Sequence, residues 1–321
     1  VGLSLSKRAE DEYATKDKVL ALHPRANVLD NTPADSKPMP WWNLKYKNRW
    51  LSDGSIVAGN PIFTNFLWNE IGRGADLKKL EKWMEENQET MRELTAAVFA
   101  TEAPRYTDFF SVSKINLKQA KHGEMLFNQT CKGCHGVYEK AWNLPHSKKL
   151  SPIDQLATTA VHYPKQTKVI DVGTDPLRYK GMKYFAKDLN RLKISKSMGT
   201  IVEPQIGYVP PPLVGIWSRW PYMHNNSMPS LCAVLTEASK RPAVYYSGAA
   251  IKPEEDFDQE CNGYPLAEKV PVAWKDAEHL YNTARAGMTN TGHDQKIFIK
   301  DGVEIFSAQD KLDLIMYLKT L

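Results

Sequence analysis

The sequence predicts a mainly α-helical fold with long loops and an extended N-terminal segment. Three stretches carry helical patterns: one begins at Asp76, one covers residues 117–130, and one begins at Ser307. Apart from short apolar stretches at 244–246 and 297–299, nothing alternates with the period of two residues that half-buried strands show. With 321 residues, the chain is long enough for two small domains or for one core with long excursions.

Residues 1–60 are rich in proline, asparagine, aspartate and lysine, which disfavour regular structure. Four aromatic side chains gather in this segment, at Trp41, Trp42, Tyr46 and Trp50. We therefore expect an irregular segment that its aromatic side chains pin to a protein surface.

The first helix is predicted from Asp76 to a point before Pro104. Its apolar side chains recur mostly every three or four residues, so they would lie on one face of a helix. We assign residues 1–110 to a connector segment plus this helix, and residues 111–321 to a second domain. The apolar positions of the helix are Leu77, Leu80, Met84, Met91, Leu94 and Val98.

The second domain should be bounded by two more helices. One runs over 117–130, where Gly123 would let another backbone approach closely. The other starts at Ser307, with Asp310 three residues later as in a capping box. Between residues 150 and 212 we expect short helices and loops, and the prolines of "YVPPPLVGIW", residues 208–217, require an extended backbone.

Composition excludes some classes of function. Hydrophobic residues make up 42% of the chain, but no run approaches the roughly 18 apolar residues of a membrane helix, so no membrane span is predicted. The net charge of +5 is spread along the chain without a dense cluster of lysine and arginine. We therefore expect no nucleic-acid binding, and an acidic protein partner fits better. The chain does not open with a secretory signal pattern, so we expect an export signal to have been removed or to lie outside this sequence.

The stretch "FNQTCKGCHGVYEK", residues 127–140, contains Cys131, Cys134 and His135. A zinc site would need a second ligand pair, but Cys232 and Cys261 are distant and form no such pair. A redox thiol pair usually opens a helix after a strand, a context absent from this sequence. A plain disulfide leaves the histidine unexplained.

Covalent haem attachment accounts for all three residues. In a Cys-x-x-Cys-His motif the two thiols bind the porphyrin edge, and the following histidine becomes the proximal iron ligand. The sequence therefore predicts one covalent haem c, bound through Cys131 and Cys134 with His135 on the iron.

Several stretches resemble known haem proteins. "KHGEMLFNQTCKGCHG" resembles the helix that enters the haem site of cytochromes c, and "SAQDKLDLIMYLKTL" resembles their closing helix. "PPPLVGIWSRWPYMHNNSMPSLCAVL", "RPAVYYSG" and "MTNTGHDQ" resemble the C-terminal half of di-haem cytochromes that include rubber oxygenases and are related to cytochrome c peroxidases. "PMPWWNLKYK" resembles the connector between the two haem domains of those proteins. The resemblance implies a cytochrome c-type haem domain with loop insertions over residues 111–321. Unlike those proteins, this chain carries a single Cys-x-x-Cys-His motif.

The sixth iron ligand is left open by the residues themselves. The resemblance implies His224 as the distal ligand, with Trp217 and Tyr222 against the haem. A methionine could take its place, and Met288 is the leading candidate. Alternatively the sixth position is open, and His293 and His162 are then candidates for distal acid-base groups. The other methionines in question are Met198, Met223 and Met228.

Two further features have an ordinary and a functional interpretation. Cys232 and Cys261 either form a disulfide, as haem attachment in an oxidising compartment allows, or stay as free thiols. The lysines near the motif either form a docking ring for an acidic partner or belong to an ordinary solvated face. They are Lys118, Lys121, Lys132 and Lys140.

These observations lead to two hypotheses of function. The first is a c-type cytochrome that transfers single electrons between redox partners in the periplasm or another extracellular compartment. The second makes the chain the haem-relay part of a di-haem oxygenase or peroxidase whose reactive haem lies in another domain or chain. Whether the chain is itself an enzyme stays open between them. The resemblance also allows a calcium ion, but the sequence offers no motif for one.

Overall fold

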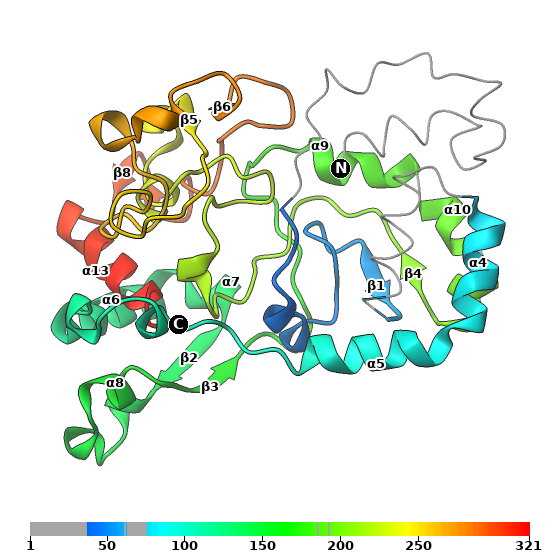
Figure 1. The fold of residues 1–321 in the computed structure, drawn as a ribbon, viewed down its shortest axis with the longest axis horizontal. Coiled ribbons are helices and arrows are strands. Elements are labelled where there is room, and N and C mark those ends of the chain that lie inside the picture. The colour runs from blue at the N-terminus through cyan, green and yellow to red at the C-terminus, as the bar shows by residue number, and fades with distance from the viewer. Residues whose placement is uncertain (1–36, 61, 63–75, 185, 192) are drawn as a thin grey trace. The chain divides into compact units, whose positions relative to one another are not determined.

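The structure, a computed structural model, describes residues 37–60, 62, 76–184, 186–191 and 193–321 (Figure 1). Its described residues fall into two compact units. The first contains residues up to 102, 165–209 and 285–288, and the second contains 103–164, 210–284 and 289–321. The first 36 residues of the expected N-terminal segment lie outside the described part.

The prediction of a mainly α-helical fold is wrong, because helices and strands are mixed. Within the described residues, β1 to β8 form four two-stranded antiparallel sheets. The strands are two to five residues long, too short for a period of two to stand out in the sequence. Many of the helices between them are single turns.

The first unit combines short helices with one small sheet, in which β1 pairs with β4 (Figure 1). Its small core contains Ile56, Met182 and Val202. Its elements are η1 (Trp41–Tyr46), β1 (Ile56–Ala58), α4 (Leu77–Glu86), α5 (Gln88–Phe99), α9 (Leu177–Lys180), η6 (Gly181–Tyr184), α10 (Ala186–Arg191), α11 (Lys193–Ser197) and β4 (Ile201–Val202).

Two expectations for this unit need correction. The helix predicted from Asp76 is two helices, α4 and α5, which part at Asn87; there the backbone leaves the helical region and the side chain bonds the Trp83 carbonyl at 2.7 Å. Such local bonding of asparagine competes with helix continuation.

In the segment predicted to be irregular, Trp41–Tyr46 forms a 3-10 helix whose Asn43 and Leu44 are buried.

The second unit contains three more small sheets and the two helices α6 and α13. Its elements are η2 (Tyr106–Asp108), η3 (Val112–Lys114), α6 (Leu117–Thr130), α7 (Lys132–His135), β2 (Val137–Lys140), η4 (Ala141–Asn143), η5 (Ser147–Lys149), α8 (Pro152–Gln155), β3 (Thr158–His162), η7 (Ile216–Ser218), α12 (Leu231–Val234), η8 (Ala238–Lys240), β5 (Val244–Tyr246), η9 (Ala267–Lys269), η10 (Val272–Trp274), β6 (Leu280–Asn282), β7 (Ile299–Lys300), β8 (Val303–Glu304) and α13 (Ala308–Leu318).

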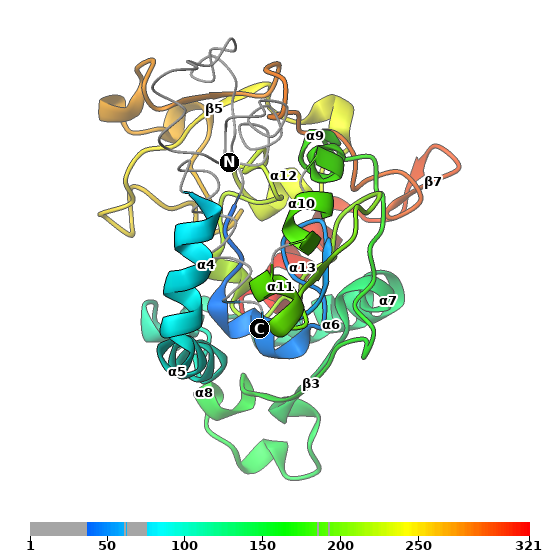
Figure 2. The same cartoon turned by 90° about the vertical axis from the view of Figure 1, so that its right-hand side faces the viewer.

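Helices α6 and α13 pack closely against each other, as Figures 1 and 2 show. A Cβ added to Gly123 on α6 would lie 2.0 Å from the carbonyl oxygen of Asp313 on α13. Only glycine allows this approach, as predicted. The start of α13 also agrees with prediction, because Ser307 and Asp310 form a capping box.

Short strands complete the second unit. The expected strand at 244–246 is β5, which pairs with β6, and the one expected at 297–299 is reduced to β7 at Ile299–Lys300. Strands β2 and β3, which the sequence analysis did not predict, form an antiparallel pair. Strand β2 begins two residues after the cysteine motif ends at His135. In the part of the chain that the structure describes, we find no helix long and apolar enough to cross a membrane.

Candidate functional site

The cysteine motif lies at the join of two helices. Helix α6 ends at Thr130, Cys131 caps it by donating its backbone N–H to Phe127, and α7 carries the chain to His135. Gly136 then turns the chain with φ of 86°, and a Cβ there would lie 2.7 Å from the carbonyl oxygen of His162. The local backbone therefore requires glycine directly after the histidine.

His135 is held from its Nδ1 side. This nitrogen donates a hydrogen bond to the carbonyl of Pro211 at 2.9 Å, and the hydroxyl of Tyr138 donates to the carbonyl of His135 at 2.7 Å. A bonded Nδ1–H leaves Nε2 with its lone pair, which is the form that binds a metal.

The proline-rich loop that accepts this bond is itself fixed. The hydroxyl of Tyr163 donates a hydrogen bond to the Pro210 carbonyl at 2.5 Å. The backbone N–H of Leu213 donates one to the Tyr138 hydroxyl at 2.6 Å. Tyr138 thus bonds both the motif and the loop. Because prolines supply no donors, tyrosine hydroxyls supply the bonds that hold the loop beside the motif.

The ring of a second histidine lies close to that of His135. The ring centres of His135 and His293 lie 6.3 Å apart, with 60° between the ring planes. A metal-to-imidazole bond is about 2 Å long and each ring nitrogen lies roughly 1 Å from the ring centre, so two imidazoles on opposite sides of one metal have centres about 6 Å apart. The observed spacing therefore fits one iron between the two rings.

The pKa values of both imidazoles are lowered. Burial lowers the pKa of His135, and burial together with the nearby His135 and Arg241 lowers the pKa of His293 to about 4. Neutral imidazole is the metal-binding form. The backbone of His293 has φ of 57°, in the left-handed region that residues other than glycine adopt uncommonly.

The two motif cysteines are free thiols in the structure. Burial, with a smaller effect of Cys134, raises the pKa of Cys131 to about 12. Redox-active thiols need a lowered pKa, because the thiolate is the nucleophile. The surroundings of Cys131 thus oppose thiol-redox chemistry and agree with a thiol that carries a covalent link.

His224, the distal ligand suggested by the resemblance, lies half-buried in the turn between Tyr222 and Met228, which bridge each other. Trp217 and Tyr222 are core residues. Trp217 donates to the Pro104 carbonyl at 2.7 Å, and Tyr222 accepts from the Asn262 side chain at 2.7 Å. These contacts give both aromatic residues a packing role, and their predicted role at the haem stays a prediction.

The other candidates for the sixth position are spread through the chain. Met288 is buried and belongs to the first unit, whereas Met228 is fully buried in the core of the second. His162 is an exposed residue of β3 that pairs with Glu139 at 2.8 Å. The sequence analysis named His293 only as an acid-base group. His293 lies in the same stretch before the last helix, "MTNTGHDQ", that contains the predicted methionine candidate Met288.

Two secondary expectations have clear outcomes. Cys232 and Cys261 form a disulfide, with Cα atoms 5.0 Å apart. Lys140 cannot belong to a docking ring of lysines, because it is only 1% exposed. Its ammonium donates to Thr158 at 3.0 Å and to the Thr320 carbonyl at 2.6 Å, and also to the Leu156 carbonyl. Lys118, Lys121 and Lys132 are exposed as a docking face requires.

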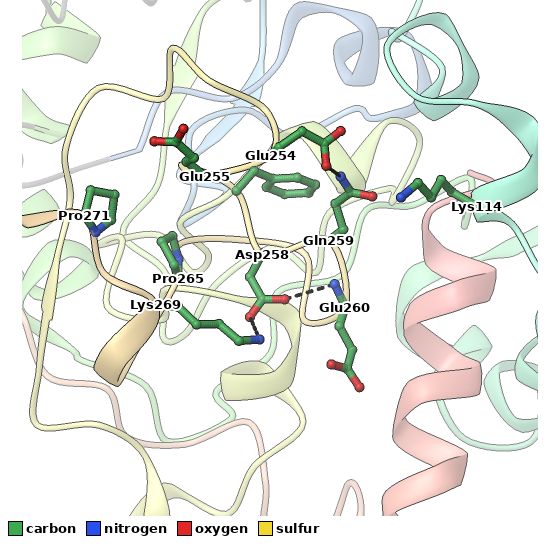
Figure 3. A pocket seen from close by; sticks show the side chains of 10 residues that line it. Lys114, Glu254, Glu255, Asp258, Gln259, Glu260, Pro265, Lys269 and Pro271 are labelled. Carbon is green, nitrogen blue, oxygen red and sulfur yellow. Dashed lines mark hydrogen bonds and ion pairs between the residues drawn. The ribbon is translucent and has the colours of Figure 1, made fainter.

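A depression of about 570 Å³ lies elsewhere on the second unit (Figure 3). Asp258, in its wall, bonds Lys269 at 3.2 Å and the backbone N–H of Glu260 at 2.9 Å, so its oxygens are already engaged. Among the described residues no group of three or more histidine, cysteine and acidic side chains could hold a metal ion. The lining residues are Lys114, Glu254, Glu255, Phe257, Asp258, Gln259, Glu260, Pro265, Lys269 and Pro271.

Comparison with known families identifies part of this unit. A family model described as RoxA-like, cytochrome c-like matches residues 207–246. The chain therefore contains a cytochrome c-like region. This region includes the loop that accepts the hydrogen bond from His135 and also includes Arg241. The match points to haem-related electron transfer.

Two curated relatives come from Sinorhizobium fredii (strain NBRC 101917 / NGR234). Uncharacterized protein y4iJ is 31% identical over 122 residues, which are 37% of this chain and 19% of that protein. Uncharacterized protein y4iM is 33% identical over 123 residues, 36% of this chain and 27% of that protein. The aligned part thus spans about a fifth of one relative and about a quarter of the other.

Proposed function

We propose that this chain is a c-type cytochrome that carries one covalent haem and transfers single electrons between redox partners. The observation that carries the proposal is the 6.3 Å distance between the ring centres of His135 and His293, in a part of the chain that also holds two free cysteine thiols. The spacing of the Cys131-x-x-Cys134-His135 motif and the cytochrome c-like match support the same conclusion.

Each residue has a defined task in this proposal. Cys131 and Cys134 form the two thioether links, and His135 is the proximal ligand through Nε2. We assign the distal position to His293 rather than to His224, because the ring centre of His293 lies 6.3 Å from that of His135, the distance expected for two imidazoles that bind one metal ion. When bound, the haem supplies one-electron iron chemistry. If both histidines bound the iron, no position would stay open for oxygen or peroxide, and the site would favour electron transfer.

The proposal extends to compartment and partner. Covalent haem and the disulfide between Cys232 and Cys261 both suit an exported protein in an oxidising compartment, so we place it in the periplasm or outside the cell. The exposed Lys118, Lys121 and Lys132 flank the motif and suit an acidic redox partner.

A second candidate is the haem-relay part of a di-haem oxygenase or peroxidase. The observation that favours it is the length of the curated relatives, because most of each lies outside the alignment. In that case a second haem, in another domain or chain, would do the chemistry and this site would supply electrons.

One set of measurements tests both candidates. The protein is expressed with a cytochrome c maturation system, its intact mass is measured, and visible spectra are recorded oxidised and reduced, with and without carbon monoxide. We expect a mass increment of one haem and a low-spin spectrum that carbon monoxide leaves unchanged. No covalent haem would contradict the proposal, and a high-spin component that binds carbon monoxide would favour the enzyme.

A further inference from the structure

Arg241 is a buried cation that joins several segments of the second unit. It is 7% exposed, and its Nε donates to the carbonyls of Ala233 at 3.1 Å and Thr236 at 2.8 Å. Its Nη1 donates to the carbonyls of Asn290 at 2.5 Å and Gly292 at 2.7 Å. One guanidinium thus joins the end of α12 to Asn290 and Gly292, in the loop just before His293.

The same loop is tied a second and a third time to the segment around Arg241. The side-chain amide of Asn290 donates to the Pro242 carbonyl at 2.9 Å. After His293, the carboxylate of Asp294 accepts from the backbone N–H of Ala238 at 2.8 Å. The loop that carries His293 is therefore bonded to residues 238–242, which include Arg241.

One donor of Arg241 is left over. Its Nη2 is buried and has no hydrogen-bond partner among the described residues. The nearby Asp294 directs its two carboxylate oxygens to the backbone N–H groups of Ala238 and Gln295 and makes no hydrogen bond to Nη2. A buried guanidinium N–H without an acceptor is costly, so an anionic group is expected to complete it.

We infer that Arg241 is a positioning residue for His293 and that its Nη2 donates to a propionate carboxylate of the haem. The inference rests on the proposed function. A guanidinium suits this task, since its planar fork can bond carbonyls on one edge and a carboxylate on another. A cation fixed beside a haem also stabilises the ferrous state over the more positive ferric state, and so raises the reduction potential.

Two variants of the holoprotein separate the parts of this inference. Arg241→Gln removes the cation, so we expect a lower midpoint potential and a high-spin fraction as the His293 loop loosens. Arg241→Lys keeps the charge but removes the second nitrogen of the fork, so the potential should stay nearer to wild type. In both, the propionate bending vibration in the resonance Raman spectrum should shift.

Lys240→Gln is the matched control, because Lys240 is an exposed neighbour that pairs with Glu237 at 2.7 Å. It removes the same charge and should leave the potential, the spin state and the vibration unchanged. If Arg241→Gln does not fold, the comparison of Arg241→Lys with wild type still decides. A folded Arg241→Lys protein with covalent haem and an unchanged propionate vibration would overturn the inference, whereas absence of covalent haem from wild type would overturn the proposed function instead.

Discussion

The imidazole Nδ1 of His122 and the carboxylate Oδ2 of Asp313 lie 2.7 Å apart and join α6 to α13 across 191 residues of sequence. The side chain of Asp313 is 8% exposed, and it also accepts from Gln309 at 2.8 Å. The bond lies beside the close approach at Gly123, so the crossing of the two helices is fixed by packing and by a hydrogen bond together.

His122→Ala should lower the free energy of unfolding by about 1 kcal/mol, because a buried carboxylate loses a donor while the histidine itself is partly exposed. Chemical denaturation measures the change. His162→Ala is the control, since its bond to Glu139 is as short but both partners are more than half exposed. An equal loss in the two variants would contradict this explanation.

Gly123→Ala should destabilise the second unit by about 3 kcal/mol, because the added methyl group would collide with the backbone of α13 rather than with a movable side chain. Gly133→Ala, in α7, places its methyl group where no atom lies within 4 Å. That variant should keep or slightly raise the stability. Thermal unfolding of the two holoproteins checks the difference, and a tolerated Gly123→Ala would show that the helices can part at small cost.

The sequence predicted what depends on local patterns. The bounds of α6 and the capping box at Ser307 follow from residues that are neighbours in the sequence. The role of Gly123 follows from its lack of a side chain, which the sequence shows directly. The mixed fold escaped prediction because strands of two to five residues carry no readable period and pair through their backbones.

The candidate site shows the same division. The proximal half was predictable, because Cys131, Cys134 and His135 are adjacent and their spacing specifies the chemistry. His293 comes from a loop 158 residues beyond His135 by residue number, and no local pattern links the two. Arg241 and Asn290 bond the loop that places His293 near His135, and only the structure shows these long-range bonds.

Stability should rise between pH 7 and about pH 9, and Lys140 should account for part of the rise. Burial, opposed by Glu124, lowers the pKa of Lys140 to about 7 from its ordinary value of 10.5. Between these two values the unfolded chain binds more protons than the folded chain, so stability increases with pH and levels off below pH 7. Lys319, whose pKa burial lowers to about 8, contributes in the same direction.

Denaturation of wild type and Lys140→Met at several pH values tests this expectation. The variant should be less stable throughout, because the carbonyls of Leu156 and Thr320 lose their donor, and its rise with pH should be smaller. Lys132→Met, at an exposed position, should leave the slope unchanged. A slope that Lys140→Met does not alter would assign the pH dependence to other groups.

Cys134→Ala should lose one thioether link and most of the yield of holoprotein, because two attachments fix the haem against His135. The alkaline pyridine spectrum of the reduced haem distinguishes one link from two, and the intact mass reports attachment. The disulfide variant Cys232→Ala serves as the control for the loss of a cysteine as such, since its thiol belongs to a separate bridge. A Cys134→Ala protein with two thioether links would refute the attachment.

His293→Ala should convert the oxidised haem from low spin to high spin and let carbon monoxide bind the reduced iron, because it removes the imidazole whose ring centre lies 6.3 Å from that of His135. His224→Ala should leave both properties unchanged if His293 is the ligand. The reverse result, with His224→Ala high-spin and His293→Ala low-spin, would restore the assignment that the resemblance first implied. Restoration of the low-spin spectrum by added imidazole in His293→Ala alone would show that the opened position is the distal one, since free imidazole binds only where a protein ligand has left the iron.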